Sequence, residues 1–149
     1  MLKARIPIYM SMLLVLIALF VVGCDGPNND DTKGKVMSLT GVLKSDFSNV
    51  NEIDVQFSDG NKFSVTDSKT IQDIVSRIKS IEVRETDSKG VGYLYFFDLK
   101  DGNQTYRLDS NLTFGGKNYE STNDNSKKLN DFILKLGRDR IPGLLPGVQ

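Results

Sequence analysis

The feature that most constrains this chain is the segment Val21-Val22-Gly23-Cys24, where the character of the sequence changes abruptly. Before it, Lys3 and Arg5 precede an apolar run that extends from Ile6 to Val22. After it comes a stretch rich in Gly, Pro, Asn and Asp, from Asp25 to Lys35. A basic start, an apolar run and a small residue before the junction are the layout of a secretory signal peptide. The folded part of the protein must therefore be built from the residues after the junction.

The same segment resembles the bacterial lipobox, in which an aliphatic residue at minus three and a small residue at minus one precede an obligatory cysteine. Val21 and Gly23 fill these two positions, Val22 lies between them, and Cys24 is the only cysteine of the chain. The resemblance implies that the Cys24 thiol receives a diacylglyceryl group and that residues 1–23 are removed. Two acyl chains hold a protein stably on a membrane, so we expect a lipid-anchored protein on the extracytoplasmic side of the cell membrane.

An uncleaved transmembrane helix is the alternative, because the run from Ile6 to Val22 is close to the shortest that spans a bilayer. The Gly-Cys junction, the sharp change in polarity and the lack of a basic cluster after it favour the lipobox. A buried, inert thiol at Cys24 is disfavoured because the polar residues that follow it cannot form a core.

Removing residues 1–23 from the 149-residue chain leaves 126 residues, which suits one domain with a single core. It also removes two of the 19 basic side chains and none of the 19 acidic ones, so the net charge becomes −2. A chain with this charge balance lacks the excess of basic residues that is typical of nucleic-acid-binding proteins. We expect residues 24–35 to be the lipidated N-terminus and a disordered tether, residues 36–137 a small domain, and residues 138–149 a Pro/Gly-rich tail.

The absence of histidine from the chain excludes Ser-His-Asp and Cys-His catalysis and the usual zinc sites. The sequence also has no phosphate loop, dinucleotide glycine fingerprint or calcium loop. Acidic residues cluster at Asp98, Asp101 and Asp109, but carboxylates beside a turn are usually solvated. We therefore expect a protein that is not an enzyme and takes no metal or cofactor. An enzyme that uses two carboxylates across a cleft is the least favoured alternative.

Alternating apolar residues predict strands in the first half of the domain, beginning with a weak one between Met37 and Leu43. A clearer pattern surrounds Asp59-Gly60-Asn61. A three-residue loop there predicts a hairpin with Phe57 opposite Phe63 and Val55 opposite Val65, and places the apolar side chains on one face.

Two helices are predicted from apolar residues spaced along one helical face. The first begins at a cap formed by Asp67 or Ser68 and carries Ile71, Ile74, Val75, Ile78 and Ile81. The second has a cap among Thr122, Asn123 and Asn125, carries Leu129, Phe132, Ile133 and Leu136, and has Gly137 as its terminator.

The most aromatic segment, from Tyr93 to Leu99, predicts a strand that turns at Asp101 to Asn103 into a second hairpin. Pairing Leu99 with Tyr106 places Phe97 opposite Leu108 on the core side. A further hairpin is predicted from Leu112, Phe114, the Gly115-Gly116 turn and Tyr119. The fold class is therefore α+β, an antiparallel sheet of hairpins with two amphipathic helices on one face.

The same register places Phe96 opposite Asp109 and Leu94 opposite Asn111, on the polar side of the sheet. Leu94 and Phe96 are thus apolar residues on a face whose other side chains are polar and expected to be solvated. Either the tail segment from Ile141 to Pro146 covers them, or their strand is buried on both faces, or they are a patch that docks a protein partner.

Val65-Thr66-Asp67 before an Ile-rich helix, the aromatic hairpin and Gly116-Lys117-Asn118-Tyr119 before a Leu-rich helix resemble a group of small, uncharacterised lipoproteins of Gram-positive bacteria. This resemblance is one of pattern, covers most of residues 36–137 and offers no catalytic residues. It implies an extracytoplasmic, membrane-tethered module. We expect a protein-interaction module of the cell envelope, with exclusion of redundant conjugation or regulation as specific versions. The alternative is a solute or cell-wall-fragment binding lipoprotein, which predicts a concave pocket with convergent polar groups.

Overall fold

The computed structural model describes residues 34–148, and the predicted signal peptide, Cys24 and most of the predicted tether lie outside this range. The strands of the described part are β1 (Met37–Ser38), β2 (Val50–Phe57), β3 (Lys62–Val65), β4 (Glu82–Thr86), β5 (Tyr95–Asp101), β6 (Gln104–Asp109), β7 (Thr113–Phe114) and β8 (Lys117–Ser121). The helices are α2 (Leu39–Leu43), α3 (Ser68–Lys79) and α4 (Asn125–Arg140).

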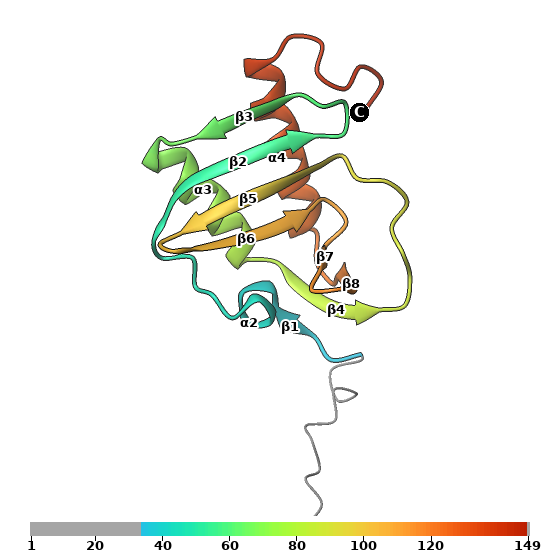
Figure 1. The fold of residues 1–149 in the computed structure, drawn as a ribbon. Coiled ribbons are helices and arrows are strands. Elements are labelled where there is room, and N and C mark those ends of the chain that lie inside the picture. Colours follow the sequence, from blue (N-terminus) through green and yellow to red (C-terminus); the bar gives the residue numbers. More distant parts are fainter. Residues whose placement is uncertain (1–33, 149) are drawn as a thin grey trace, which may run out of the picture. The chain divides into compact units, whose positions relative to one another are not determined.

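Within residues 34–148, two antiparallel four-stranded sheets and three helices confirm the α+β class. The larger sheet has the order β3-β2-β5-β6, and α3 and α4 both lie behind it in Figure 1. The smaller sheet has the order β1-β4-β8-β7. The division into two sheets was not predicted. It arises in part because Leu112, with a left-handed φ of 59°, turns the chain sharply between β6 and β7.

The weak strand predicted between Met37 and Leu43 is mostly the short helix α2. Only Met37 and Ser38 pair with β4. The helix begins because the Ser38 hydroxyl accepts the N–H of Gly41 at 3.1 Å, which is an N-terminal cap. Local capping therefore outweighs the alternation of apolar residues in this segment.

The first hairpin, β2–β3, keeps the predicted apolar face but not the predicted register. Val55 pairs with Phe63 and Ile53 pairs with Val65, a shift of two residues from the expected partners. Because the shift is even, every apolar side chain stays on the same side of the sheet.

The cause of the shift is the position of the glycine in the turn. The Phe57 N–H donates to the Asn61 carbonyl at 2.8 Å, so the loop is residues 58–60 and not residues 59–61. Gly60 closes this loop with a φ of 88°, the left-handed conformation that a three-residue hairpin loop requires at its last position.

The second hairpin, β5–β6, has the predicted register, with Leu99 opposite Tyr106 and Phe96 opposite Asp109. The expected pairing of Leu94 with Asn111 does not form, because Leu94 precedes β5. The Leu94 N–H instead donates to the Ser110 hydroxyl at 2.9 Å.

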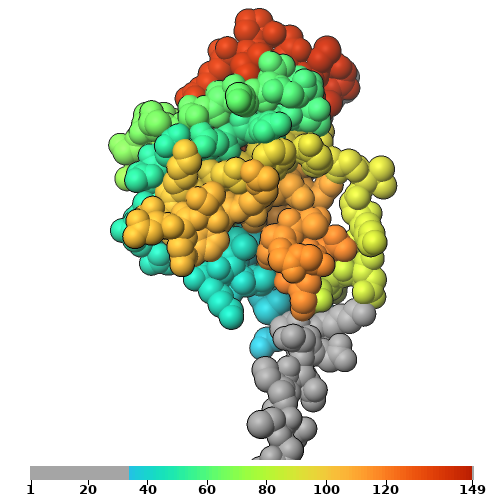
Figure 2. All heavy atoms as spheres, viewed as in Figure 1, coloured from blue at the N-terminus to red at the C-terminus, as the bar shows by residue number. Residues whose placement is uncertain are grey.

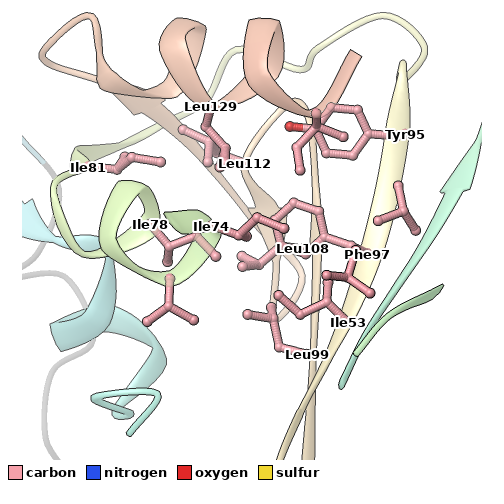
Figure 3. Close-up of a cluster of buried hydrophobic side chains, with 14 of the residues drawn as sticks. Ile53, Ile74, Ile78, Ile81, Tyr95, Phe97, Leu99, Leu108, Leu112 and Leu129 are labelled. Carbon is pink, nitrogen blue, oxygen red and sulfur yellow. The ribbon is translucent and has the colours of Figure 1, made fainter. Parts of the chain in front are cut away.

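One apolar cluster fills the space between the larger sheet, the helices and the smaller sheet. Figure 3 shows Ile74 and Ile78 of α3 facing Phe97 and Leu108 of the sheet, and all four are buried. The helix starts at Asp67, whose carboxylate accepts the Thr70 N–H at 2.8 Å. The hydrogen bonds from Thr70 also lower the pKa of Asp67. Ile71, Ile74, Val75 and Ile78 of the predicted apolar face are thus the buried face of this helix. Ile81, which was also predicted on the helix, is buried but lies beyond its end at Lys79.

The predicted end of the last helix at Gly137 is wrong, because α4 continues to Arg140. Gly137 is needed instead for close packing: a Cβ there would lie 2.5 Å from Cδ2 of Leu144 and 2.6 Å from Cζ of Phe57. Leu144 is itself buried, so the tail packs on the helix-covered side of the sheet. The predicted cap among Thr122, Asn123 and Asn125 is also wrong, because the N-cap residue is Asp124, whose side chain makes no capping hydrogen bond. Asn123 supports the start of the helix from one residue further back, where its side-chain oxygen accepts the N–H of Asn125 at 3.1 Å.

Candidate functional site

The lipobox residues Val21, Val22, Gly23 and Cys24 lie outside the described residues, so lipidation stays a prediction. Within residues 34–148, no helix is both long and apolar enough to cross a membrane. The same range contains no group of three Cys, Asp or Glu side chains that could hold a metal ion.

The outer face of the larger sheet, opposite the helices, is polar, and several of its charges form ion pairs. The Lys100 ammonium lies 2.9 Å from carboxylate oxygens of both Glu52 and Asp54. The hydrogen bonds from Ser64 and Lys100 lower the pKa of Asp54. Exposed ion pairs of this kind contribute little stability, so their main effect is a balanced, solvated surface.

Phe96 is the half-buried aromatic side chain on this polar face. The Arg107 guanidinium lies over its ring, 4.5 Å from the centroid, and the Tyr93 ring centroid is 5.7 Å away. Arg107 is held there by Asp98, which accepts two hydrogen bonds from it at 2.6 and 2.7 Å. We call Tyr93, Phe96 and Arg107 the Phe96 surface. A cation over an aromatic ring is attracted by the ring's negative face, so this arrangement is favourable without further cover.

A hollow of about 480 Å³ adjoins the Phe96 surface. It runs across the strands from Phe96 and Asp98 past Gln56 to Lys62 and Ser64. Figure 2 shows this face toward the viewer, with the loop that leads into β5 in yellow at its right edge. A protein partner can place a side chain in such a hollow and pack it against the neighbouring aromatic ring.

The two residues of the predicted patch have different roles. Leu94 packs against the core cluster, whereas Phe96 lies on the outer face. The C-terminal tail does not cover Phe96, because the tail packs near Gly137 on the other side of the sheet.

Val91, which is fully exposed in the loop before β5, is an apolar residue that we did not predict at this edge. Val91 lies between Gly90 and Gly92, so no alternation of apolar and polar residues pointed to it in the sequence.

The three clustered acids have structural roles. Asp98 holds Arg107. Asp109 accepts the N–H groups of Asn111 and Thr113 at 2.8 and 3.0 Å, which orders the turn after β6. Asp101 accepts hydrogen bonds from the Ser45 hydroxyl and the Asn49 N–H, in the segment before β2. Each of the three carboxylates therefore holds nearby residues in place through hydrogen bonds.

A second concave surface runs along α3, and we call it the α3 groove. Its volume is about 610 Å³, within the range of ordinary ligand sites. One wall is the helix from Ser68 to Lys79, and the other is the segment from Phe47 to Asn51. No sequence pattern predicted it, because its walls come from segments that are distant in the chain.

In comparisons with known protein families, with curated proteins and with solved structures, nothing matches this chain.

Proposed function

We propose that this chain is a non-enzymatic, lipid-anchored module on the extracytoplasmic side of a cell membrane that contacts another envelope protein. The lipobox-like segment ending at Cys24 supports the anchor. The Phe96 surface is the contact site in this proposal. The observation that carries it is the position of Phe96 on a charged sheet face, beside a hollow and the exposed ring of Tyr93.

The composition of the Phe96 surface suits a protein partner. Aromatic residues and Arg are enriched at interfaces and supply most of the binding energy there. Arg107 is already fixed by Asp98, so little side-chain freedom is lost when a partner binds. Tyr93 is 46% exposed and can bury a large area on contact.

Crosslinking in intact cells tests this proposal. A photoreactive phenylalanine at Tyr93 is expected to give a discrete crosslinked protein, because the ring lies at the edge of the contact site. The Phe96→Ala change should reduce the yield about tenfold, equivalent to about 1.4 kcal/mol of binding. Thr105, exposed on the same sheet, is the control position and should give no such product.

Two results would contradict the proposed contact. One is the absence of any crosslinked protein from Tyr93 while the variant is present at the parent's level. The other is a product that forms equally from Thr105 or is unchanged by Phe96→Ala. An unaltered melting temperature of the Phe96→Ala variant excludes unfolding as the cause of a loss.

The alternative function, binding of a solute or cell-wall fragment, is favoured by one observation, the α3 groove. This groove combines an apolar floor with a polar rim, as a site for a small ligand does.

A further inference from the structure

The outer face of the larger sheet is arranged in rows, because residues that pair on neighbouring strands point to the same side of the sheet. One row runs across the sheet through Ser64, Asp54, Asp98 and Arg107. Asp54 accepts a hydrogen bond from Ser64, and its other oxygen lies 2.9 Å from the Lys100 ammonium. Asp98 accepts two hydrogen bonds from Arg107. Both carboxylates of this row are therefore engaged within the protein.

The next row consists of Lys62, Gln56 and Phe96. All three line the hollow, and Lys62 and Gln56 are exposed. Within residues 34–148, the Lys62 ammonium has no ion pair and the Gln56 amide has no hydrogen bond. A free cation, a free amide and an aromatic ring thus lie side by side on this face of the sheet.

Lys62 decides which charge the hollow attracts. The carboxylates in its lining are Asp54 and Asp98, and their negative charges are balanced by Lys100 and Arg107. Lys62 is the cation of the lining, and no counter-ion lies beside it in the described part of the chain. An approaching anionic group can therefore pair with Lys62 without displacing an existing partner. Charge complementarity of this kind speeds encounter and fixes the register of two proteins.

We propose that the partner protein presents an acidic side chain to Lys62 and an apolar side chain to the Phe96 ring. This inference rests on the proposed function and adds the chemistry of the partner's contact. Lys62 and Phe96 lie two strands apart, so about 10 Å separates the two contacts at about 4.8 Å per strand. The Gln56 amide, between them, bonds to polar groups of the partner.

A basic side chain of the partner is a poorer match for the hollow. Asp54 and Asp98 lie opposite each other on β2 and β5, which is an arrangement that could attract a cation. A cation from outside would, however, have to displace Lys100 or Arg107 from these carboxylates. It would also approach the like charge of Lys62, which is unfavourable.

Zero-length crosslinking of the full, anchored chain in host membranes tests the proposal. A water-soluble carbodiimide joins an amine to a carboxylate where the two groups are in contact. We expect an amide bond between Lys62 and an Asp or Glu of the same protein that a photoreactive phenylalanine at Tyr93 captures. The Lys100 ammonium, 2.9 Å from the Glu52 carboxylate, is the internal control and should couple within the chain in the same sample.

The outcomes separate this inference from the function on which it rests. If Tyr93 captures a partner and Lys100 couples to Glu52, but Lys62 forms no bond to that partner, the acidic contact is wrong and the protein contact stands. If Tyr93 captures no protein, both fail. A bond from the same partner's amines to Asp54 or Asp98 would show that a basic side chain occupies the hollow, and would also overturn the inference.

A matched pair of charge reversals measures the effect of Lys62. Lys62→Glu should lower the yield of the Tyr93 crosslink about tenfold, because two carboxylates then face each other. Lys69→Glu makes the same change at an exposed position of α3 outside the hollow and should leave the yield unchanged. Lys62→Arg should keep the Tyr93 crosslink, since the charge is retained, but lose the carbodiimide product. Equal effects of the two reversals, or no effect of Lys62→Glu, would contradict an acidic contact at Lys62.

Discussion

The Ile74→Asp variant is expected not to form the folded domain. Ile74 is fully buried, and Figure 3 shows it in the cluster between α3 and the larger sheet. Loss of a buried Ile side chain alone costs about 2–5 kcal/mol. An unpaired buried carboxylate adds a further penalty of several kcal/mol. Together these approach the total stability of a small domain, about 5–15 kcal/mol.

Circular dichroism and urea unfolding measure this effect. The variant should lack the near-ultraviolet signal of the packed aromatic rings and show no cooperative transition. Gln72→Asp is the control, because it places the same residue on the exposed side of α3 and should change stability by only about 0.5 kcal/mol. A cooperative transition of Ile74→Asp at the parent's urea midpoint would show that α3 does not pack as described.

The Gly137→Val variant is expected to lower stability by about 2–3 kcal/mol, and the melting temperature by roughly 10 °C. Even a Cβ at this position would overlap the buried side chains of Leu144 and Phe57. The rigid Phe57 ring cannot move aside without disturbing the sheet. Since Val forms helices better than Gly, helix propensity alone predicts a small gain. A loss of stability would therefore show that the Val side chain overlaps the buried side chains around position 137.

Differential scanning calorimetry of the variant beside Lys135→Val separates these two effects. Lys135 lies in the same helix but is exposed, so Val there should change the melting temperature by only a few degrees. If Gly137→Val melted at or above the parent's temperature, the tail could not pack against α4 through Leu144.

Periodicity predicted the parts of the fold in which buried and exposed residues alternate regularly. The buried face of α3 and the β5–β6 register follow from spacing alone, because a wrong face would expose residues such as Ile74 and Phe97. The β2–β3 turn was misplaced because both readings keep the same face, and only the left-handed Gly60 distinguishes them. Gly137 was assigned as a helix end because a glycine required for close packing has the same sequence signal as one that terminates a helix.

The two candidate surfaces differ in how far the sequence predicts them. The outward position of Phe96 follows from the register of its hairpin. Its contact with Arg107 depends on rotamers that no pattern encodes. The α3 groove depends on Asp101 holding a distant loop, a tertiary hydrogen bond between residues more than fifty positions apart. Such contacts follow only from the assembled fold.

The anchor at Cys24 is the central claim, since the proposed envelope role depends on it. Mass spectrometry of the protein extracted from host membranes tests it most directly. We expect a mature chain that begins at Cys24, lacks residues 1–23 and carries the added mass of a diacylglyceryl group, and we expect a Cys24→Ser variant to show neither change. A membrane-extracted chain that keeps residues 1–23, or one that starts at an unmodified residue, would contradict a lipid anchor.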